Sequence, residues 1–265
     1  MVEFHARKRF GQNFLVAGPT IAKIVGLINP KVDERIIEVG PGRGALTFPM
    51  ADRGAQVYAV EIDRDLAAYL REQSVERDNV TIIEGDFLAY EPPDEFQNFV
   101  LVGNLPYNIT SPTVDWCVQY HERIERIVFM VQAELAARLC GKPGSKDWSP
   151  LSIFTQMLFD VKRCFKVGPG NFRPQPNVQS AIITLTPRRE RGITPTPKMD
   201  RVVRAAFKHR RKMLANNLMQ EIVPDHDTAV EVLGEIGLKA SCRAEELTID
   251  QFLTLTELLS ARKLV

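Results

Sequence analysis

The chain has 265 residues and a formal net charge of +1, from 34 Lys and Arg against 33 Asp and Glu. Hydrophobic residues make up 45% and charged residues 25%, which is typical of a folded globular protein and excludes a disordered chain, a collagen and a disulfide scaffold. The length allows one large domain or two smaller ones.

The cysteines and histidines do not form a metal-binding pattern. The four cysteines include no C-x-x-C pair and the four histidines no H-E-x-x-H motif, so no metal is expected. No stretch approaches the ~20 apolar residues of a membrane span, and the opening MVEFHARKRF lacks the apolar centre of a signal peptide. We therefore expect a cytoplasmic protein that does not contact a membrane and keeps its thiols reduced.

Between about residue 20 and residue 185, short β-branched runs alternate with helical patterns. This alternation predicts an α/β fold whose sheet carries helices on both faces and binds ligands at the carboxyl ends of its strands. The expected strands are Arg35–Val39, Gln56–Val60, Val80–Glu84, Phe99–Val102, Arg126–Val131 and Gln179–Thr186. The expected helices between them cover 44–53, 65–77, 112–120 and 132–140.

The first expected strand runs into the glycine-rich turn Glu38-Val-Gly40-Pro-Gly42-Arg-Gly44. The turn lacks the G-x-G-x-x-G spacing that seats a dinucleotide, so a ligand without a pyrophosphate is favoured. The second strand ends at Glu61, where an acid can accept hydrogen bonds from ribose hydroxyls. The third ends at Asp86, which could accept from an adenine amine while Ile62 and Phe87 hold the ring faces. This arrangement resembles the class I S-adenosylmethionine-dependent methyltransferases.

The fourth expected strand ends in Asn104-Leu-Pro-Tyr107-Asn. An exocyclic adenine amine is a poor nucleophile because its lone pair is delocalised into the ring. The Asn104 side-chain oxygen and the Leu105 carbonyl can accept its two N–H bonds, Pro106 stiffens the turn, and Tyr107 offers a stacking face. Ordinary turn chemistry is the alternative, but at this strand end the motif favours methylation of an amino group through positioning and electrostatics.

From Pro187 onward only helical patterns remain. Residues 187–198, PRRERGITPTPK, are typical of a linker. The expected helices after it are Met199–Glu221, Thr228–Ile236 and 248–262, the last opening with the capping-box sequence Thr248-Ile-Asp-Gln251. We therefore predict a large catalytic α/β domain over residues 1–187 and a small all-helical domain over residues 188–265.

Basic residues gather locally although the net charge is near neutral. Residues 201–212 contain six Lys and Arg and no acid, and the HARKR segment and residues 188–191 form two further patches. One such patch is consistent with a solvated helix face, whereas three of them favour a polyanionic partner.

In combination these motifs resemble the ribosomal RNA adenine dimethyltransferases over nearly the whole chain. The matching segments, in chain order, are RFGQNFL (residues 9–15), EVGPGRGALT, VEID, GDF, NLPYNI, PGSK (143–146), NFRPQPNVQS (171–180), AFKHRRK (206–212) and RAEEL (243–247).

The resemblance implies an enzyme that uses S-adenosylmethionine to dimethylate the N6 amines of two adjacent adenosines. These adenosines lie in the 3′-terminal hairpin loop of 16S rRNA in the small ribosomal subunit, and the reaction is a late step of ribosome biogenesis. Its implied cofactor-binding residues are Asn13, Leu15, Gly40, Glu61, Asp86 and Asn104. Its implied catalytic residues are Asn104, Leu105, Pro106, Tyr107 and Phe172, with Phe172 stacking on the base opposite Tyr107. The RNA phosphates would be held by Arg204, Lys208, Arg210, Arg211 and Lys212.

Three alternatives stay open. An Erm-type methylase of 23S rRNA, which confers macrolide resistance, shares the fold, although the C-terminal motifs and Leu105 favour the small-subunit enzymes. A non-catalytic assembly or transcription factor could keep the fold, but the intact Glu61, Asp86 and N-L-P-Y argue against it. A DNA amino-methyltransferase usually needs a larger target-recognition domain than the region after Pro187. Nothing in the sequence indicates oligomerisation, so a monomer is expected.

Overall fold

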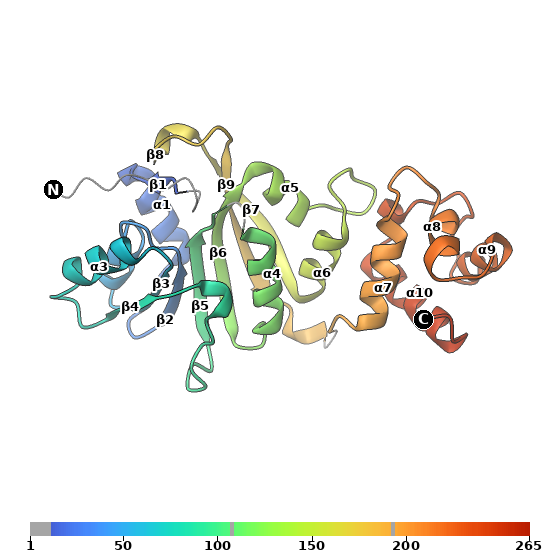
Figure 1. The fold of residues 1–265 in the computed structure, drawn as a ribbon, viewed down its shortest axis with the longest axis horizontal. Coiled ribbons are helices and arrows are strands. Elements are labelled where there is room, and N and C mark those ends of the chain that lie inside the picture. The colour runs from blue at the N-terminus through green and yellow to red at the C-terminus, as the bar shows by residue number, and fades with distance from the viewer. Residues whose placement is uncertain (1–11, 107–108, 192–193) are drawn as a thin grey trace. The chain divides into compact units, whose positions relative to one another are not determined.

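The computed structural model describes residues 12–106, 109–191 and 194–265 (Figure 1). Its contacts divide the chain into a first unit, residues 1–136 with 159–189, and a second unit, residues 137–158 with 190–265. The observed division at 189/190 lies close to the predicted boundary at 187/188, but residues 137–158 group with the second unit. Among the described residues, no helix is both long enough and apolar enough to cross a membrane.

A seven-stranded sheet forms the centre of the first unit. In sheet order its strands are β4 (Val80–Glu84), β3 (Gln56–Glu61), β2 (Arg35–Val39), β5 (Phe99–Asn104), β6 (Ile124–Gln132), β9 (Ser180–Pro187) and β7 (Phe159–Val167). The five strands from β4 to β6 are parallel, and β9 runs antiparallel to both β6 and β7. The α/β prediction is confirmed, with an antiparallel edge added to a parallel core.

The sequence patterns did not predict β7. This strand contains the exposed residues Lys162, Arg163 and Lys166, so it lacks the apolar run that marks a buried parallel strand. It lies at the edge of the sheet, where exposed lysines protect a strand from pairing with another molecule. The edge position therefore explains why the strand is so polar.

Helices cover both faces of the sheet (Figure 1). The first unit contains α1 (Gly18–Ile28), α2 (Thr47–Ala51), α3 (Arg64–Gln73), α4 (Thr110–Gln119) and most of α5 (Ala133–Leu139). From β2 the chain steps outward through β3 to β4 and then returns to β5 and β6 on the other side. Because parallel crossovers are right-handed, α2 and α3 pack on one face and α4 on the opposite face.

The hydrophobic core under α1 fixes the first unit. Ile24 and Val25, with Ile28 one helical turn further on, lie on one face of α1 and are almost fully buried. They belong to the same buried cluster as Ile36 on β2 and Val100 on β5. The core therefore joins α1 to the two central strands of the sheet.

The second unit is helical. Its helices are α6 (Pro150–Leu158), α7 (Pro197–Phe207), α8 (Leu214–Glu221), α9 (His226–Glu235) and α10 (Ile249–Ala261). The predicted capping box at Thr248 and Gln251 is present, and Gly237 adopts the left-handed conformation expected just beyond a helix end, with φ +73°.

The prediction of one helix over Met199–Glu221 was wrong, because the chain forms α7 and α8 with a break at residues 208–213. The buried Asn217 amide donates to the Ala206 carbonyl at 2.7 Å and to the His209 carbonyl at 3.2 Å. These carbonyls lie at the end of α7, so the side chain satisfies acceptors that a helix end leaves unpaired. The break moves Arg210, Arg211 and Lys212 from a helix onto a turn.

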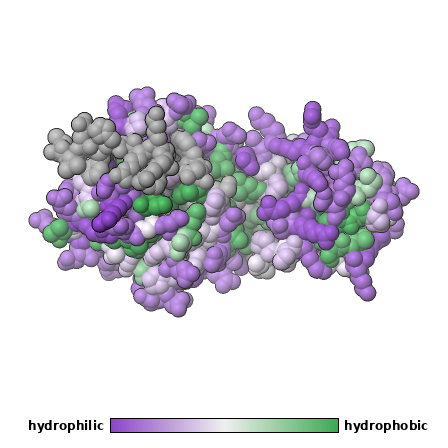
Figure 2. Space-filling view, in the orientation of Figure 1, coloured by the Kyte–Doolittle hydropathy of each residue, from purple (hydrophilic) through white to green (hydrophobic). Residues whose placement is uncertain are grey.

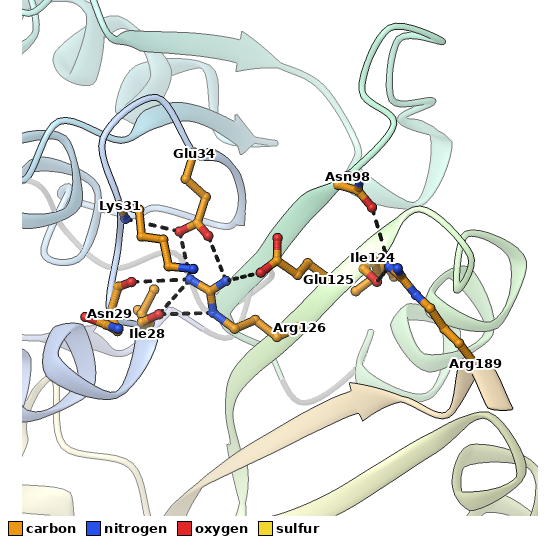
Figure 3. A network of polar contacts seen from close by, with 9 residues as sticks. All are labelled: Ile28, Asn29, Lys31, Glu34, Asn98, Ile124, Glu125, Arg126 and Arg189. Carbon is orange, nitrogen blue, oxygen red and sulfur yellow. Dashed lines mark hydrogen bonds and ion pairs between the residues drawn. The ribbon is translucent and has the colours of Figure 1, made fainter.

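A guanidinium joins three elements of the first unit at the end of the sheet away from the strands' carboxyl ends (Figure 3). Arg126 on β6 makes two 2.7 Å contacts with the Glu34 carboxylate, which lies just before β2. It also donates to the Ile28 carbonyl at 2.9 Å and to the Asn29 carbonyl at 3.4 Å, at the end of α1. The cation thereby satisfies carbonyls at the negative end of the helix dipole.

We expect Arg126→Ala to lower the free energy of unfolding by about 2–3 kcal/mol, because it leaves the largely buried Glu34 carboxylate and two carbonyls without their partner. Urea denaturation measures the loss. Arg71→Ala, which removes an exposed pair with Glu84, is the matched control and should cost less than about 1 kcal/mol. Equal losses in the two variants would contradict the role given to Arg126.

Candidate functional site

The candidate site lies where the direction of the strand order reverses, between β2 and β5. Ligands of open α/β sheets bind at such a point, outside the carboxyl ends of the strands. A cavity of about 400 Å³ opens there, a size usual for small-molecule sites. Its lining includes all the predicted cofactor residues, together with Leu105, Pro106 and Phe172.

The glycine turn after β2 forms one wall of the cavity. Gly42 has φ +60° and Gly44 has φ +80°, which side-chain-bearing residues rarely adopt. A Cβ on Gly44 would lie 2.3 Å from the Phe48 ring, and one on Gly42 would lie 3.1 Å from the Phe14 ring. The turn therefore needs glycine both for its conformation and for close packing under the loop.

Glu61 ends β3 and supports this turn. Its two carboxylate oxygens accept the Gly42 N–H at 3.1 Å and the Asp63 N–H at 2.9 Å. The side chain is 4% exposed, and burial raises the pKa of Glu61 above its ordinary value although these N–H bonds oppose the shift. Each oxygen keeps a further lone pair, so the carboxylate can still accept from a ligand hydroxyl.

Glu38 lines the cavity as well, and sequence reasoning gave it no role. It is 2% exposed, and the Thr47 hydroxyl donates to its carboxyl at 2.5 Å. Burial, with a smaller contribution from the neighbouring Glu61 charge, raises the pKa of Glu38 to about 7. The acid at the start of the glycine motif was visible in the sequence, but its burial depends on the position of β2 between β3 and β5.

The far end of the cavity is suited to a flat ring. Asp86 follows β4 and accepts the Leu88 N–H at 2.9 Å through one oxygen, so the other oxygen can accept from a ligand. Ile62 lines this part of the cavity and is 50% exposed, which is unusual for a large apolar side chain. Phe87 also lines it, but its buried ring packs on Trp116 with 4.6 Å between ring centroids.

Asn104 ends β5 with a fixed orientation. Its Nδ2 donates to the Asn13 carbonyl at 3.1 Å. Because a carbonyl can only accept, this bond determines that the side-chain oxygen Oδ1 is the end left to accept from a ligand. The Leu105 N–H donates to the Met130 carbonyl at 3.0 Å, which anchors the next residue to β6. Tyr107 and Asn108 lie outside the described residues.

The segment that begins at Gln12 joins the two halves of the site. The Gln12 side-chain amide donates to the Asp63 carboxylate at 3.1 Å, and the next residue supplies the carbonyl that orients Asn104. Gln12 belongs to the RFGQNFL motif, but sequence reasoning assigned it no role. Its function depends on a contact across 51 positions of the chain, which no local pattern reveals.

Phe172 and Leu15 pair across a two-stranded sheet, β1 (Phe14–Leu15) with β8 (Phe172–Arg173). Phe172 lines the cavity, yet its ring is 1% exposed and belongs to the hydrophobic core under the sheet. In this structure the ring is thus a packed part of the cavity wall. Its stacking on a substrate base stays a prediction.

The predicted RNA-binding residues do not line this cavity and belong to the second unit. All five are exposed, but three have protein partners: Arg204 pairs with Asp200, Lys208 with Glu221, and Arg210 with Glu245 and the Lys146 carbonyl. Within the part of the chain that the structure describes, no ion pair is recorded for Arg211 or Lys212. Contact with RNA stays a prediction for all five.

Comparison with known proteins identifies related chains. The family model described as ribosomal RNA adenine dimethylase matches residues 3–261. A ribosomal RNA small subunit methyltransferase A from Dechloromonas aromatica is 37% identical over 257 residues, which cover 96% of this chain and 98% of the relative.

Two solved structures are similar over most of the chain. The 23S rRNA methyltransferase ErmE is 32% identical with a TM-score of 0.73, covering 94% of this chain and 100% of that one. A dimethyladenosine transferase from Plasmodium falciparum has a TM-score of 0.82 at 23% identity, covering 95% of this chain and 98% of that one. These matches confirm the methyltransferase fold.

The raised pKa of Glu38 predicts a pH effect on stability. Since the folded state favours the neutral carboxyl, its stabilisation is complete below pH 4.5 and is lost as the pH rises through about 7. Glu38→Gln keeps the acceptor for Thr47 but cannot titrate. Between pH 4.5 and 8 the original protein should therefore lose on the order of 2–3 kcal/mol more stability than this variant.

Urea denaturation at a series of pH values tests this expectation. Glu84→Gln, which alters an exposed carboxylate on β4, should leave the original pH dependence unchanged. Parallel stability curves for the original protein and Glu38→Gln would contradict a raised pKa of Glu38 in the folded state.

Proposed function

Because the chain belongs to the ribosomal RNA adenine dimethylase family and is therefore an S-adenosylmethionine-dependent methyltransferase, we propose which substrate it modifies and how. The substrate is 16S rRNA of the small ribosomal subunit, dimethylated at the N6 amines of two adjacent adenosines in the 3′-terminal hairpin loop. The observation that carries the proposal is the orientation of Asn104, whose oxygen is left as an acceptor at the wall of the cofactor cavity.

The acceptor groups and apolar side chains of the cavity fit S-adenosylmethionine. Glu61 offers a buried carboxylate for ribose hydroxyls, and the exposed side chain of Ile62 beside Asp86 suits an adenine ring. Because the glycines of the turn carry no side chains, the rest of the ligand can lie against their backbone. Asn13, Leu15, Gly40 and Asn104 complete the proposed set of cofactor residues. When bound, this cofactor supplies an electrophilic methyl group.

In the proposed reaction the protein acts by holding the amine. Asn104 Oδ1 accepts one N–H of the adenine amine and the Leu105 carbonyl accepts the other, which aims the nitrogen lone pair at the methyl group. Pro106 limits the movement of this turn, and Tyr107 and Phe172 are proposed to stack on the base. Most of the rate enhancement then comes from orientation and fixed dipoles, without a strong general base.

The comparisons favour the small-subunit substrate over the alternatives. The relative named for the small subunit is 37% identical, against 32% for the 23S rRNA methyltransferase ErmE, at similar coverage. The fixed Asn104 and the buried Glu61 argue against a factor that has lost activity. We further propose that the enzyme acts in the cytoplasm as a monomer, late in subunit assembly.

The role of Asn104 can be separated from cofactor binding. Asn104→Asp keeps an acceptor oxygen but cannot donate to the Asn13 carbonyl, so we expect methyl transfer to fall at least about 100-fold. The affinity for S-adenosylmethionine, measured by calorimetry, should stay within about tenfold. Asn98→Ala, remote from the cavity, is the matched control. Normal turnover by Asn104→Asp would contradict the role of Asn104 in orienting the adenine amine.

Transfer of labelled methyl groups tests the substrate. Small subunits from a strain that lacks the dimethylase should accept label at paired adenosines and approach four methyl groups per subunit. Large subunits and naked rRNA run in parallel. Label on large-subunit rRNA would instead support the Erm-type alternative, and cofactor binding without any transfer would support a non-catalytic factor.

A further inference from the structure

One wall of the cofactor cavity is formed by residues 12–15, all of which line it. Strand β1 of this segment pairs with β8, and the Val16 N–H donates to the Asn171 carbonyl at 2.9 Å. On the carboxyl side of Asn13 the wall is therefore held by backbone hydrogen bonds. The Asn13 carbonyl accepts from the Asn104 side chain, so the position of this carbonyl decides how Asn104 is oriented.

On the amino side of Asn13, a side chain holds the wall. Gln12 Nε2 donates to Asp63 Oδ2 at 3.1 Å, across 51 positions of the chain. The other carboxylate oxygen of Asp63 accepts the Asp65 N–H at 3.1 Å and caps α3. The Asp63 N–H donates in turn to the Glu61 carboxylate at 2.9 Å. Gln12 is thus fastened just beyond the end of β3.

The hydrogen bond between Gln12 and Asp63 is partly shielded from water. Figure 2 shows hydrophilic side chains over much of the visible surface, which is where amides and carboxylates usually lie. Asp63, by contrast, is 3% exposed, and Gln12 is partly buried. A buried carboxylate needs donors, and a hydrogen bond to a charged group is stronger than one between neutral groups. The Gln12 amide therefore makes a bond that is costly to lose.

We propose that Gln12 is a positioning residue for methyl transfer, which fixes the Asn13 carbonyl and, through it, the acceptor oxygen of Asn104. With the bond to Asp63, the backbone at Asn13 is held from both sides. Without this bond it is held from the carboxyl side, and Asn104 loses its fixed orientation. Since a small displacement near the reacting atoms can lower a rate strongly, the effect falls on kcat more than on cofactor binding. The inference rests on the proposed function and deepens it.

Gln12→Met removes the donor and keeps an unbranched side chain of similar length. In methyl transfer to small subunits we expect kcat to fall about tenfold. The KM for S-adenosylmethionine should change less than about threefold, because β1 and β8 keep the cavity wall in place. Gln97→Met is the matched control, since the exposed Gln97 amide donates to the Asp94 carbonyl at 2.8 Å and does not line the cavity. A raised KM with normal kcat would overturn the proposal.

A double variant separates positioning from a general loss of structure. Asn104→Asp already lacks the N–H that the Asn13 carbonyl orients. Adding Gln12→Met to this variant should therefore lower the residual transfer less than about twofold, against about tenfold in the original protein. Two effects that multiply would show that Gln12 does not act through Asn104, and the proposal would fail.

An exchange of groups tests the hydrogen bond itself. Gln12→Glu places a carboxylate against Asp63 and should lower kcat more than Gln12→Met does, because like charges repel. Asp63→Asn supplies an amide that can donate to the new carboxylate, while its oxygen can still cap α3. The variant with both changes should recover kcat to within about threefold of Asp63→Asn alone. A double variant no more active than Gln12→Glu would contradict the proposed role.

Amide hydrogen exchange over residues 12–16 gives a readout that does not depend on methyl transfer. Exchange there should be faster by about fivefold in Gln12→Met and unchanged in Gln97→Met. A protein that leaves small subunits unlabelled could still show this difference, so a failure of the proposed function is distinguishable from a failure of the Gln12 bond. Normal labelling by Gln12→Met, with unchanged exchange, would overturn the positioning role and leave the reaction in place.

Discussion

The parallel alignment of β2, β3, β4 and β5 is the constraint on which the site depends. Parallel strands end at one edge of a sheet, so the residues that follow them must meet although they are far apart in the chain. Gly40, Glu61, Asp86 and Asn104 meet in this way around one cavity. The apolar core under α1 and the Arg126 cluster keep the strands in this order.

Buried carboxylates at the ends of these strands connect the parts of the site, although burial of a charged group lowers the stability of the folded protein. Glu61 ties the glycine turn to the end of β3, and Asp63 receives the Gln12 side chain beside it. Burial raises the pKa of both Glu38 and Glu61, which means that the folded protein destabilises the charged form of each side chain. Ionisable groups with shifted pKa values are frequent at functional sites. Both Glu38 and Glu61 line the cavity.

The two units have different kinds of cavity. The first cavity joins apolar contacts with carboxylate and amide acceptors, which suits a ligand that carries hydroxyl and amine groups. The second is lined by three arginines and one aspartate, and two of these arginines, Arg204 and Arg210, are paired with Asp200 and Glu245.

The sequence by itself determined most of the strands of the first unit, the glycine turn and the acceptor residues, because their signals are local: β-branched runs, glycine spacing and a polar residue at each strand end. Tertiary structure alone decided the rest. The position of β7 at the edge of the sheet explains why its sequence is so charged, and the Asn217 amide caps the end of α7 from a different helix. The roles of Gln12 and Glu38 and the gathering of Arg138 with Arg204 also depend on contacts between distant segments. Local patterns record what a residue prefers, whereas burial and partners are set only when the chain has packed.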